Sequence, residues 1–72
     1  MTSTKTYGVS VCGDLIEVEW DGNVWVDGET GAQYAHAADA LRDALDRYFL
    51  EAGMHDDEER AAEIEGYLAK AE

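Results

Sequence analysis

Several features are scarce in this 72-residue chain, and each scarcity excludes a class of protein. There is no proline and no linker-like segment, so we expect one domain over residues 1–72, with residues 1–4 disordered. Cys12 is the only cysteine, which excludes internal disulfides. A lone thiol without a signal-like N-terminus predicts a reducing, cytoplasmic setting. The longest apolar run is far too short to cross a membrane.

Basic residues are also scarce. Five lysines and arginines oppose seventeen acids, and the formal net charge is −12. Binding to a phosphate backbone or an anionic lipid surface needs clustered Lys and Arg, so we expect neither nucleic acid nor membrane as a direct partner. The charge instead favours basic protein partners, above all a groove that normally holds nucleic acid. The same charge also serves solubility or a salt-rich cytoplasm.

The first third of the chain alternates apolar and polar residues with period two, which is typical of strands. Gly13-Asp14 is a two-residue turn signal, and pairing across it sets Val11 opposite Ile16 and Val9 opposite Val18. This register is self-consistent, because it gathers the large apolar side chains on one face. That face comprises Tyr7, Val9, Val11, Ile16, Val18 and Trp20.

A third strand follows the turn at residues 21–23. A three-residue loop there places Val24 and Val26 on the core face and turns Trp25 outward, among the glutamates of the second strand. An exposed tryptophan is a frequent anchor in protein interfaces. The alternative is that Trp25 is covered by the N-terminal arm or by residues 30–36.

The second half changes to helical periodicity. Apolar residues from Ala38 to Ala52 recur on one face, and Gly53 ends this helix. Its start is open, because Thr30 and Gln33 fit an earlier capping box while the segment that follows fits an extended conformation equally well.

A second helix is predicted from Asp57 to Ala71, with Ile64 and Leu68 on its apolar stripe. The element order predicts an α+β domain. Its N-terminal part is a three-stranded antiparallel meander, and the two helices pack on one face of that sheet.

Four consecutive acids, residues 56–59, begin the second helix. Consecutive helical residues diverge by about 100° each, so these carboxylates cannot converge on a cation, and we expect no metal. Asp56 and Glu59 instead fit an N-terminal capping box. Acids in a first turn also interact favourably with the helix dipole.

Further acids on this helix follow a pattern. Glu58, Glu65 and Glu72 recur every seven residues, roughly 10 Å apart along one flank, while Glu59 and Glu63 line the other. In the first helix, by contrast, Arg42 and Arg47 stand at pairing distance from acids of the same helix. The uncompensated charge is therefore concentrated on the sheet and on the last helix.

Catalysis and cofactors are not indicated. Cys12 is expected on an outer strand face, and His36 and His55 are the only candidate bases. Nothing in the sequence brings these three together or would lower the pKa of the thiol. A glycine loop of the phosphate-binding kind is also missing. We therefore expect no enzyme and no cofactor.

Small size, strong acidity, a short β-meander and helices at the C-terminal end together resemble small phage-encoded anti-CRISPR proteins directed at type I systems. The resemblance covers the whole chain and implies inhibition by binding, in which an acidic surface mimics DNA and occupies the basic DNA-binding surface of the surveillance complex. It implies a monomer or weak dimer in the host cytoplasm. The residues expected to contact such a partner are Glu17, Glu19, Trp25, Asp27, Asp57, Glu58, Glu59, Glu63, Glu65 and Glu72.

Two other interpretations stay open. Three strands followed by the helix of residues 38–52 also resemble the compact domains of some antitoxins, which bind a basic toxin and dimerise. The chain also fits a salt-adapted domain that is acidic for solubility alone. Folding at low ionic strength would exclude that last interpretation.

Overall fold

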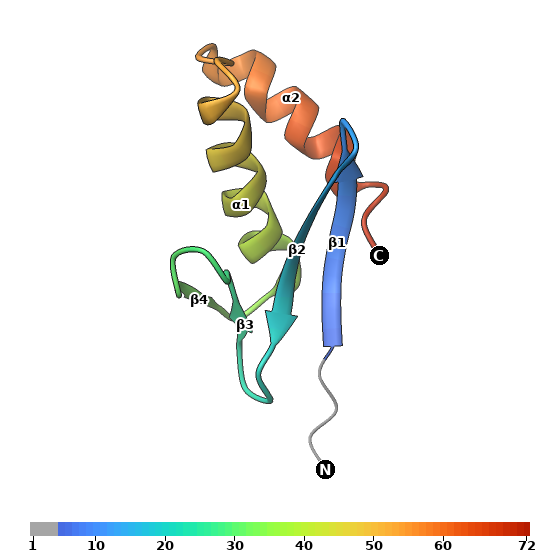
Figure 1. Cartoon of the computed structure of the whole chain (residues 1–72), viewed down its shortest axis with the longest axis vertical. Helices are drawn as coiled ribbons and strands as arrows, with labels where there is room; N and C mark the ends of the chain where they lie inside the picture. The colour runs from blue at the N-terminus through green and yellow to red at the C-terminus, as the bar shows by residue number, and fades with distance from the viewer. Residues whose placement is uncertain (1–4) are drawn as a thin grey trace.

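The computed structural model describes residues 5–72 and has an α+β architecture, in which an antiparallel four-stranded sheet carries two helices on one side (Figure 1). The strand order is β1-β2-β3-β4, so each strand pairs with its neighbour in sequence. The predicted α+β class is confirmed, whereas the prediction for residues 1–4 lies outside the described residues. The elements are β1 (Lys5–Val11), β2 (Asp14–Trp20), β3 (Trp25–Val26), β4 (Gln33–Tyr34), α1 (Ala37–Glu51) and α2 (Asp57–Leu68).

The turn between β1 and β2 is formed by Cys12 and Gly13, one residue earlier than predicted. Both have positive φ, 51° and 86°, as a type I′ turn requires, and glycine suits its second position. Val9 therefore lies opposite Ile16 and not opposite Val18. Because the pairing shifts by two residues, every side chain keeps its predicted face.

The turn between β2 and β3 has four residues and not three, which reverses the two faces of β3. The carboxylate of Asp21 accepts hydrogen bonds from the backbone N–H groups of Asn23 (2.8 Å) and Val24 (2.9 Å) and so fixes the longer loop. These bonds, the one from Val24 first, lower the pKa of Asp21. Trp25 now lies opposite Trp20 and shares its face.

The outward orientation predicted for Trp25 is therefore wrong. Its ring packs against Trp20, at 5.5 Å between centroids, and against Tyr7, at 6.2 Å, beside the hydrophobic core. Tyr34 of β4 is paired with it on the other side. Val26 takes the outer face instead, because it is paired with Glu19.

The predicted three-stranded sheet gains a fourth strand from the segment whose conformation was open. Gln33 and Tyr34 are extended and pair with β3, so the earlier capping box does not form. A tight loop leads into β4. Asp27 donates its N–H to the carbonyl oxygen of Ala32, and Gly31, with φ 75°, donates its N–H to the carbonyl oxygen of Asp27.

Helix α1, whose start the sequence left open, begins at Ala37. It is followed by Gly53 with φ 95°, a conformation that glycine adopts without strain. Helix α2 begins at Asp57 as predicted, but it ends at Leu68, three residues before the predicted end. No helix among residues 5–72 is both long enough and apolar enough to cross a membrane.

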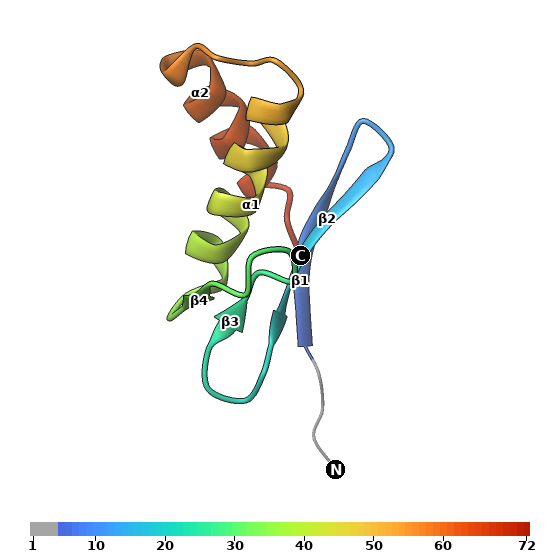
Figure 2. The ribbon, with the colours of Figure 1, turned by 60° about the vertical axis from the view of Figure 1, so that its left-hand side comes forward.

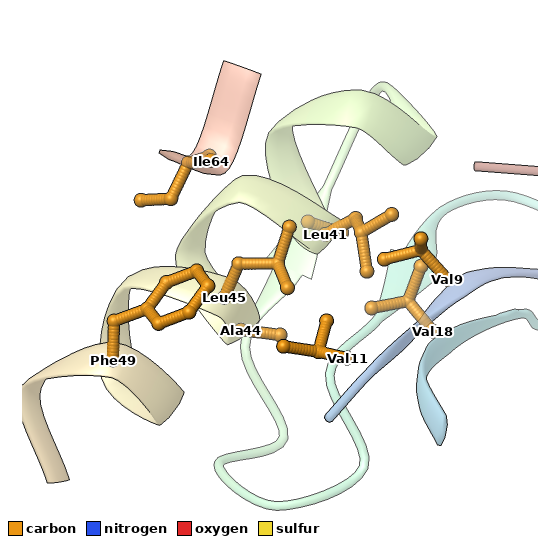
Figure 3. Close-up of a cluster of buried hydrophobic side chains, with 9 residues drawn as sticks. Val9, Val11, Val18, Leu41, Ala44, Leu45, Phe49 and Ile64 are labelled. Atoms are coloured by element: carbon orange, nitrogen blue, oxygen red, sulfur yellow. The ribbon is translucent and has the colours of Figure 1, made fainter. Parts of the chain in front are cut away.

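The core lies between the β1–β2 hairpin and α1 (Figure 3). Both helices lie on one side of the sheet, but their packing differs in detail from the prediction (Figure 2). Helix α1 contacts all four strands, whereas α2 packs on α1 and, of the strands, contacts β1 alone. Eight of the nine core residues come from the hairpin and α1. The core consists of Val9, Val11, Val18, Ala40, Leu41, Ala44, Leu45, Phe49 and Ile64.

The chain after α2 returns to the outer edge of β1. Gly8 donates its N–H to the carbonyl oxygen of Glu72 (2.9 Å), and Glu72 donates its N–H to the carbonyl oxygen of Gly8 (3.0 Å). Glycine is needed at this position, because a Cβ would stand 2.5 Å from the carbonyl oxygen of Ile16 and 2.6 Å from the Cβ of Glu17. Gly8 thus allows β1 and β2 to approach closely at the point where the C-terminal segment pairs with β1.

Candidate functional site

The two arginines of α1 form ion pairs with acids of other elements and not within α1 as predicted. Arg42 of α1 pairs with Glu65 of α2 at 2.5 Å. Arg60 of α2 reaches back to Asp46 of α1 at 2.5 Å, and its exposed fraction is only 12%. Arg42 and Arg60 thus join α2 to α1, and Arg47 joins α1 to the β3–β4 loop.

Arg60 is the most enclosed of these three cations. Besides Asp46 it contacts the carboxylate of Asp57 at 2.6 Å and donates a hydrogen bond to the carbonyl oxygen of Met54 at 3.2 Å. The hydrogen bond to Asp46 is the main cause that raises the pKa of its guanidinium. Arg60 therefore joins the start of α2, the preceding loop and α1.

Asp27 is the one buried acid among residues 5–72, and it was predicted to contact a partner. Its exposed fraction is 2%, and its carboxylate accepts hydrogen bonds from Arg47 at 2.8 Å and from the N–H of Glu29 at 2.9 Å. Arg47 also contacts the Glu29 carboxylate at 3.0 Å, and its pKa is raised, chiefly by the hydrogen bond to Asp27. Asp27 holds the β3–β4 loop against α1 and is closed to a partner in this conformation.

The sequence contained a signal for this role. An Asp two residues before an N–H donor, in the turn-rich run of residues 27–31, is typical of an Asx-turn. Residues 27–31 do not reveal that Arg47 pairs with Asp27, because Arg47 is twenty residues away on a helix.

The predicted line of acids along α2 is interrupted. Glu58 and Glu65 lie on the helix, but Glu65 is paired with Arg42. Glu72 lies beyond the end of the helix, where its backbone pairs with β1. A repeat of seven residues marks one helix flank only while the helix continues, and α2 stops at Leu68.

Six predicted contact residues remain exposed and make no ion pair among residues 5–72. One is Glu72, whose backbone pairs with β1, and the other five form two separate surfaces. Glu17 and Glu19 lie on the face of β2 turned away from α1 and are called the sheet carboxylates. Glu58, Glu59 and Glu63 on α2 are called the α2 carboxylates. Because α2 packs on α1, the two surfaces lie on opposite layers of the molecule.

Of the capping box predicted at the start of α2, the hydrogen bond to the Asp56 side chain is present. Asp56 has extended backbone, and its carboxylate accepts a hydrogen bond from the N–H of Glu59 at 3.0 Å. Asp57 pairs with Arg60. Two of the four consecutive acids thus have structural partners, and the side chains of Glu58 and Glu59 project from the first turn.

A groove of about 510 Å³ between α1 and α2 is also rich in carboxylates. Its floor includes Ala61 and Ile64, and Asp39 and Asp43 stand on its α1 wall. Asp43 accepts a hydrogen bond from the hydroxyl of Tyr34, which is the main cause that raises the pKa of that phenol to about 12. Arg42 and Arg60 also line the groove, and Arg60 pairs with two of its four carboxylates, so its negative charge is partly compensated.

Catalytic and metal-binding groups do not gather elsewhere in the described chain. Cys12 occupies the exposed hairpin turn, while His36 precedes α1 and His55 precedes α2. No group of three or more His, Cys, Asp or Glu side chains within residues 5–72 is arranged to hold a metal ion.

Comparison with known proteins finds no matching family model, no similar curated protein and no similar solved structure.

Proposed function

We propose that this protein is a non-enzymatic binding protein whose carboxylates occupy a basic, nucleic-acid-binding surface of a protein partner. One observation supports this proposal above the others. Each of the three arginines pairs with a carboxylate of a neighbouring element, whereas Glu17 and Glu19 on β2 and Glu58, Glu59 and Glu63 on α2 make no ion pair among residues 5–72. Such a surface lowers the potential around the molecule and attracts a cationic groove.

In line with the resemblance to small type I anti-CRISPR proteins, we propose the DNA-binding surface of the surveillance complex as the partner. Neighbouring carboxylates on one strand, such as Glu17 and Glu19, are about 6.6 Å apart, close to two phosphate steps of about 3.4 Å along one DNA strand. On α2, Glu59 and Glu63 are about 6 Å apart along the helix axis. Both spacings are compatible with cationic side chains that normally contact phosphates.

The test is a competition experiment with a purified type I surveillance complex and fluorescently labelled target DNA. Addition of this protein should lower the anisotropy of the bound DNA, and the inhibition should weaken steeply as salt rises, because exposed charges are screened over about 10 Å at 0.1 M. A complex that binds DNA equally well at every concentration of the protein would exclude this partner.

Two charge-reversal variants of equal net charge locate the contact surface. One carries Glu59→Lys and Glu63→Lys on α2, and the other carries Glu17→Lys and Glu19→Lys on β2. We expect the α2 variant to lose more than tenfold in inhibition, while the β2 variant loses less. If neither reversal weakens inhibition, mimicry by these carboxylates is wrong, and folding of both variants is checked by circular dichroism.

A further inference from the structure

One edge of β2 is open over half its length. Strand β3 pairs with β2 only at Glu19 and Trp20, and after Val26 the chain turns toward β4. The part of β2 nearer the hairpin turn therefore has β1 on one side and, among residues 5–72, no strand on the other. Figure 1 shows this end of the hairpin beyond β3 and β4.

The backbone groups at this edge belong to Leu15 and Glu17. In an antiparallel pair, residues alternate between those that bond across the pair and those whose N–H and C=O groups point to the far side. Gly8 points away from β2, since it bonds to Glu72 on the outer edge of β1. Its partner Glu17 must likewise point away from β1, and Leu15, two residues earlier, does the same.

A groove of about 190 Å³ borders these groups. One wall is β2 from Leu15 to Glu17, and the opposite wall is α1, with Ala44, Arg47 and Tyr48. Desolvation and the hydroxyl's hydrogen bond to Asp14, at 3.2 Å, both raise the pKa of Tyr48, so its phenol remains a donor there. The groove is therefore part apolar and part polar, with a row of backbone donors and acceptors along one side.

The side chains around the open edge indicate which sequence fits it. Leu15 has 65% of its surface exposed, the most of any large apolar residue described. Glu17 stands two residues further on the same face, and Glu29 and Glu51 border the groove. Arg47 already pairs with Glu29, so Glu17 and Glu51 are the acids there without an ion pair among residues 5–72. Across a sheet, directly opposite side chains interact, so an apolar residue suits Leu15 and a cation suits Glu17.

We propose that this edge of β2 binds an extended segment of a protein partner by strand addition, antiparallel to β2 and in line with β3. From its N-terminal side, the segment has a basic residue, a small apolar residue and a second apolar residue. The basic residue lies opposite Glu17, and the second apolar residue lies opposite Leu15. The small apolar residue between them lies over Ile16 and Ala44. This deepens the proposed function and rests on it for the basic character of the partner. Strand addition combines backbone hydrogen bonds for affinity with side chains for specificity.

A second copy of this chain is a poorer occupant. Two molecules of charge −12 would bring Glu17, Glu29 and Glu51 of each close to the acids of the other. Like charges that face one another across a pair of strands destabilise it. The other edge of the sheet is also partly occupied, since Gly8 of β1 already bonds to Glu72. The open edge of β2 is thus complementary to a basic chain.

The probe is a synthetic peptide, acetylated and amidated, with Lys-Val-Leu at its centre and about seven residues in all. We expect it to bind the full chain and to slow hydrogen exchange at the amides of Leu15 and Glu17, while the amide of Ser10 on the opposite edge is unchanged. N-methylation of the peptide at Lys or at Leu should weaken binding more than about fivefold, because each removes a hydrogen bond to β2. N-methylation at Val should have little effect, because that amide points away from β2.

Exchanging the charges of the peptide and of residue 17 tests which side chains lie opposite each other. A Glu-Val-Leu peptide should bind the wild type about threefold to fivefold more weakly than Lys-Val-Leu, and Glu17→Lys should reverse this preference. Glu19→Lys is the matched control, because it makes the same change on the same face where β3 already pairs, so the preference should stay as in the wild type.

Three results would overturn the inference. They are the absence of peptide binding, equal effects of all three N-methylations, and protection of the Leu15 and Glu17 amides that depends on protein concentration without peptide, which would indicate self-association. Failure of the DNA competition with normal binding of this peptide would instead refute the proposed function and leave the strand-addition site in place.

Discussion

The two helices of this protein are held by different physical means. Helix α1 buries five residues against the sheet, yet His36 at its start makes no capping hydrogen bond with its side chain. Helix α2 buries only Ile64, but it begins with the Asp56 cap and is tied to α1 by ion pairs of Arg42 and Arg60. Helix α1 therefore forms the core with the sheet, whereas α2 packs on α1 and carries exposed carboxylates. We expect changes to α1 to affect the whole molecule and changes to α2 to act locally.

Leucine-to-alanine substitutions in the two helices should differ most in their effect on the free energy of unfolding. Leu45 of α1 is fully buried, whereas Leu68 at the end of α2 is half-buried. Leu45→Ala should lower the free energy of unfolding by about 3 kcal/mol through lost burial and a residual cavity, enough to unfold much of so small a domain. Leu68→Ala should cost about 1 kcal/mol, because less apolar surface is lost. Urea denaturation followed by tryptophan fluorescence measures both, and equal costs would contradict the division between the helices.

Removal of the arginines tests the polar attachment of α2. Arg60→Met should speed amide hydrogen exchange throughout α2 while the exchange of core amides in α1 changes less, because three acceptors lose their donor at once. Arg42→Met is the control. Its pair with Glu65 is half exposed on both sides, and exposed pairs contribute little. If Arg42→Met loosens α2 as much as Arg60→Met does, the enclosed arginine has no special role.

The capping residues should give opposite and smaller effects. Asp56→Ala removes the acceptor for the Glu59 N–H and should destabilise the protein by about 1 kcal/mol. His36→Asp adds a cap where α1 has none, and its charge suits the positive end of the helix dipole, so it should stabilise by up to about 1 kcal/mol. Thermal unfolding by circular dichroism measures both. A destabilised His36→Asp variant would mean that the extended backbone at residue 36 cannot place a side-chain acceptor.

Much of this fold was predictable from local sequence, and the exceptions have a common cause. The period-two pattern and the apolar stripes place the first two strands and both helices within a few residues. The orientation of Trp25 and the burial of Asp27 were missed, because each depends on one residue of loop length or on a cation twenty positions away. Loop length decides which face a strand presents, and composition does not reveal it.

The same limit applies to the candidate site. The acidity of β2 and α2 was predictable, and six of the ten chosen residues lie exposed without an ion pair among residues 5–72. Glu65 and Glu72 were misjudged because the helix ends early and because Arg42 reaches across from α1. The open edge of β2 had no local signal at all, since it results from how short β3 is and not from the sequence of β2.

The smallest effect concerns the contact of Tyr34 with Asp43, which joins β4 to α1. The hydrogen bond to this carboxylate, followed by desolvation, raises the pKa of the Tyr34 phenol to about 12. Since the folded state holds the proton more tightly than an unfolded chain, whose phenol titrates near pH 10, this contact stabilises the fold fully below about pH 10. The contribution is lost as the pH rises through about 12.

Asp43→Asn should return the pKa of Tyr34 toward its ordinary value, measured by ultraviolet absorbance of tyrosinate against a Tyr34→Phe reference. Asp39→Asn, which removes the same charge one turn earlier in α1, should leave it near 12, and an equal fall in both variants would show that general charge and not this hydrogen bond sets the pKa.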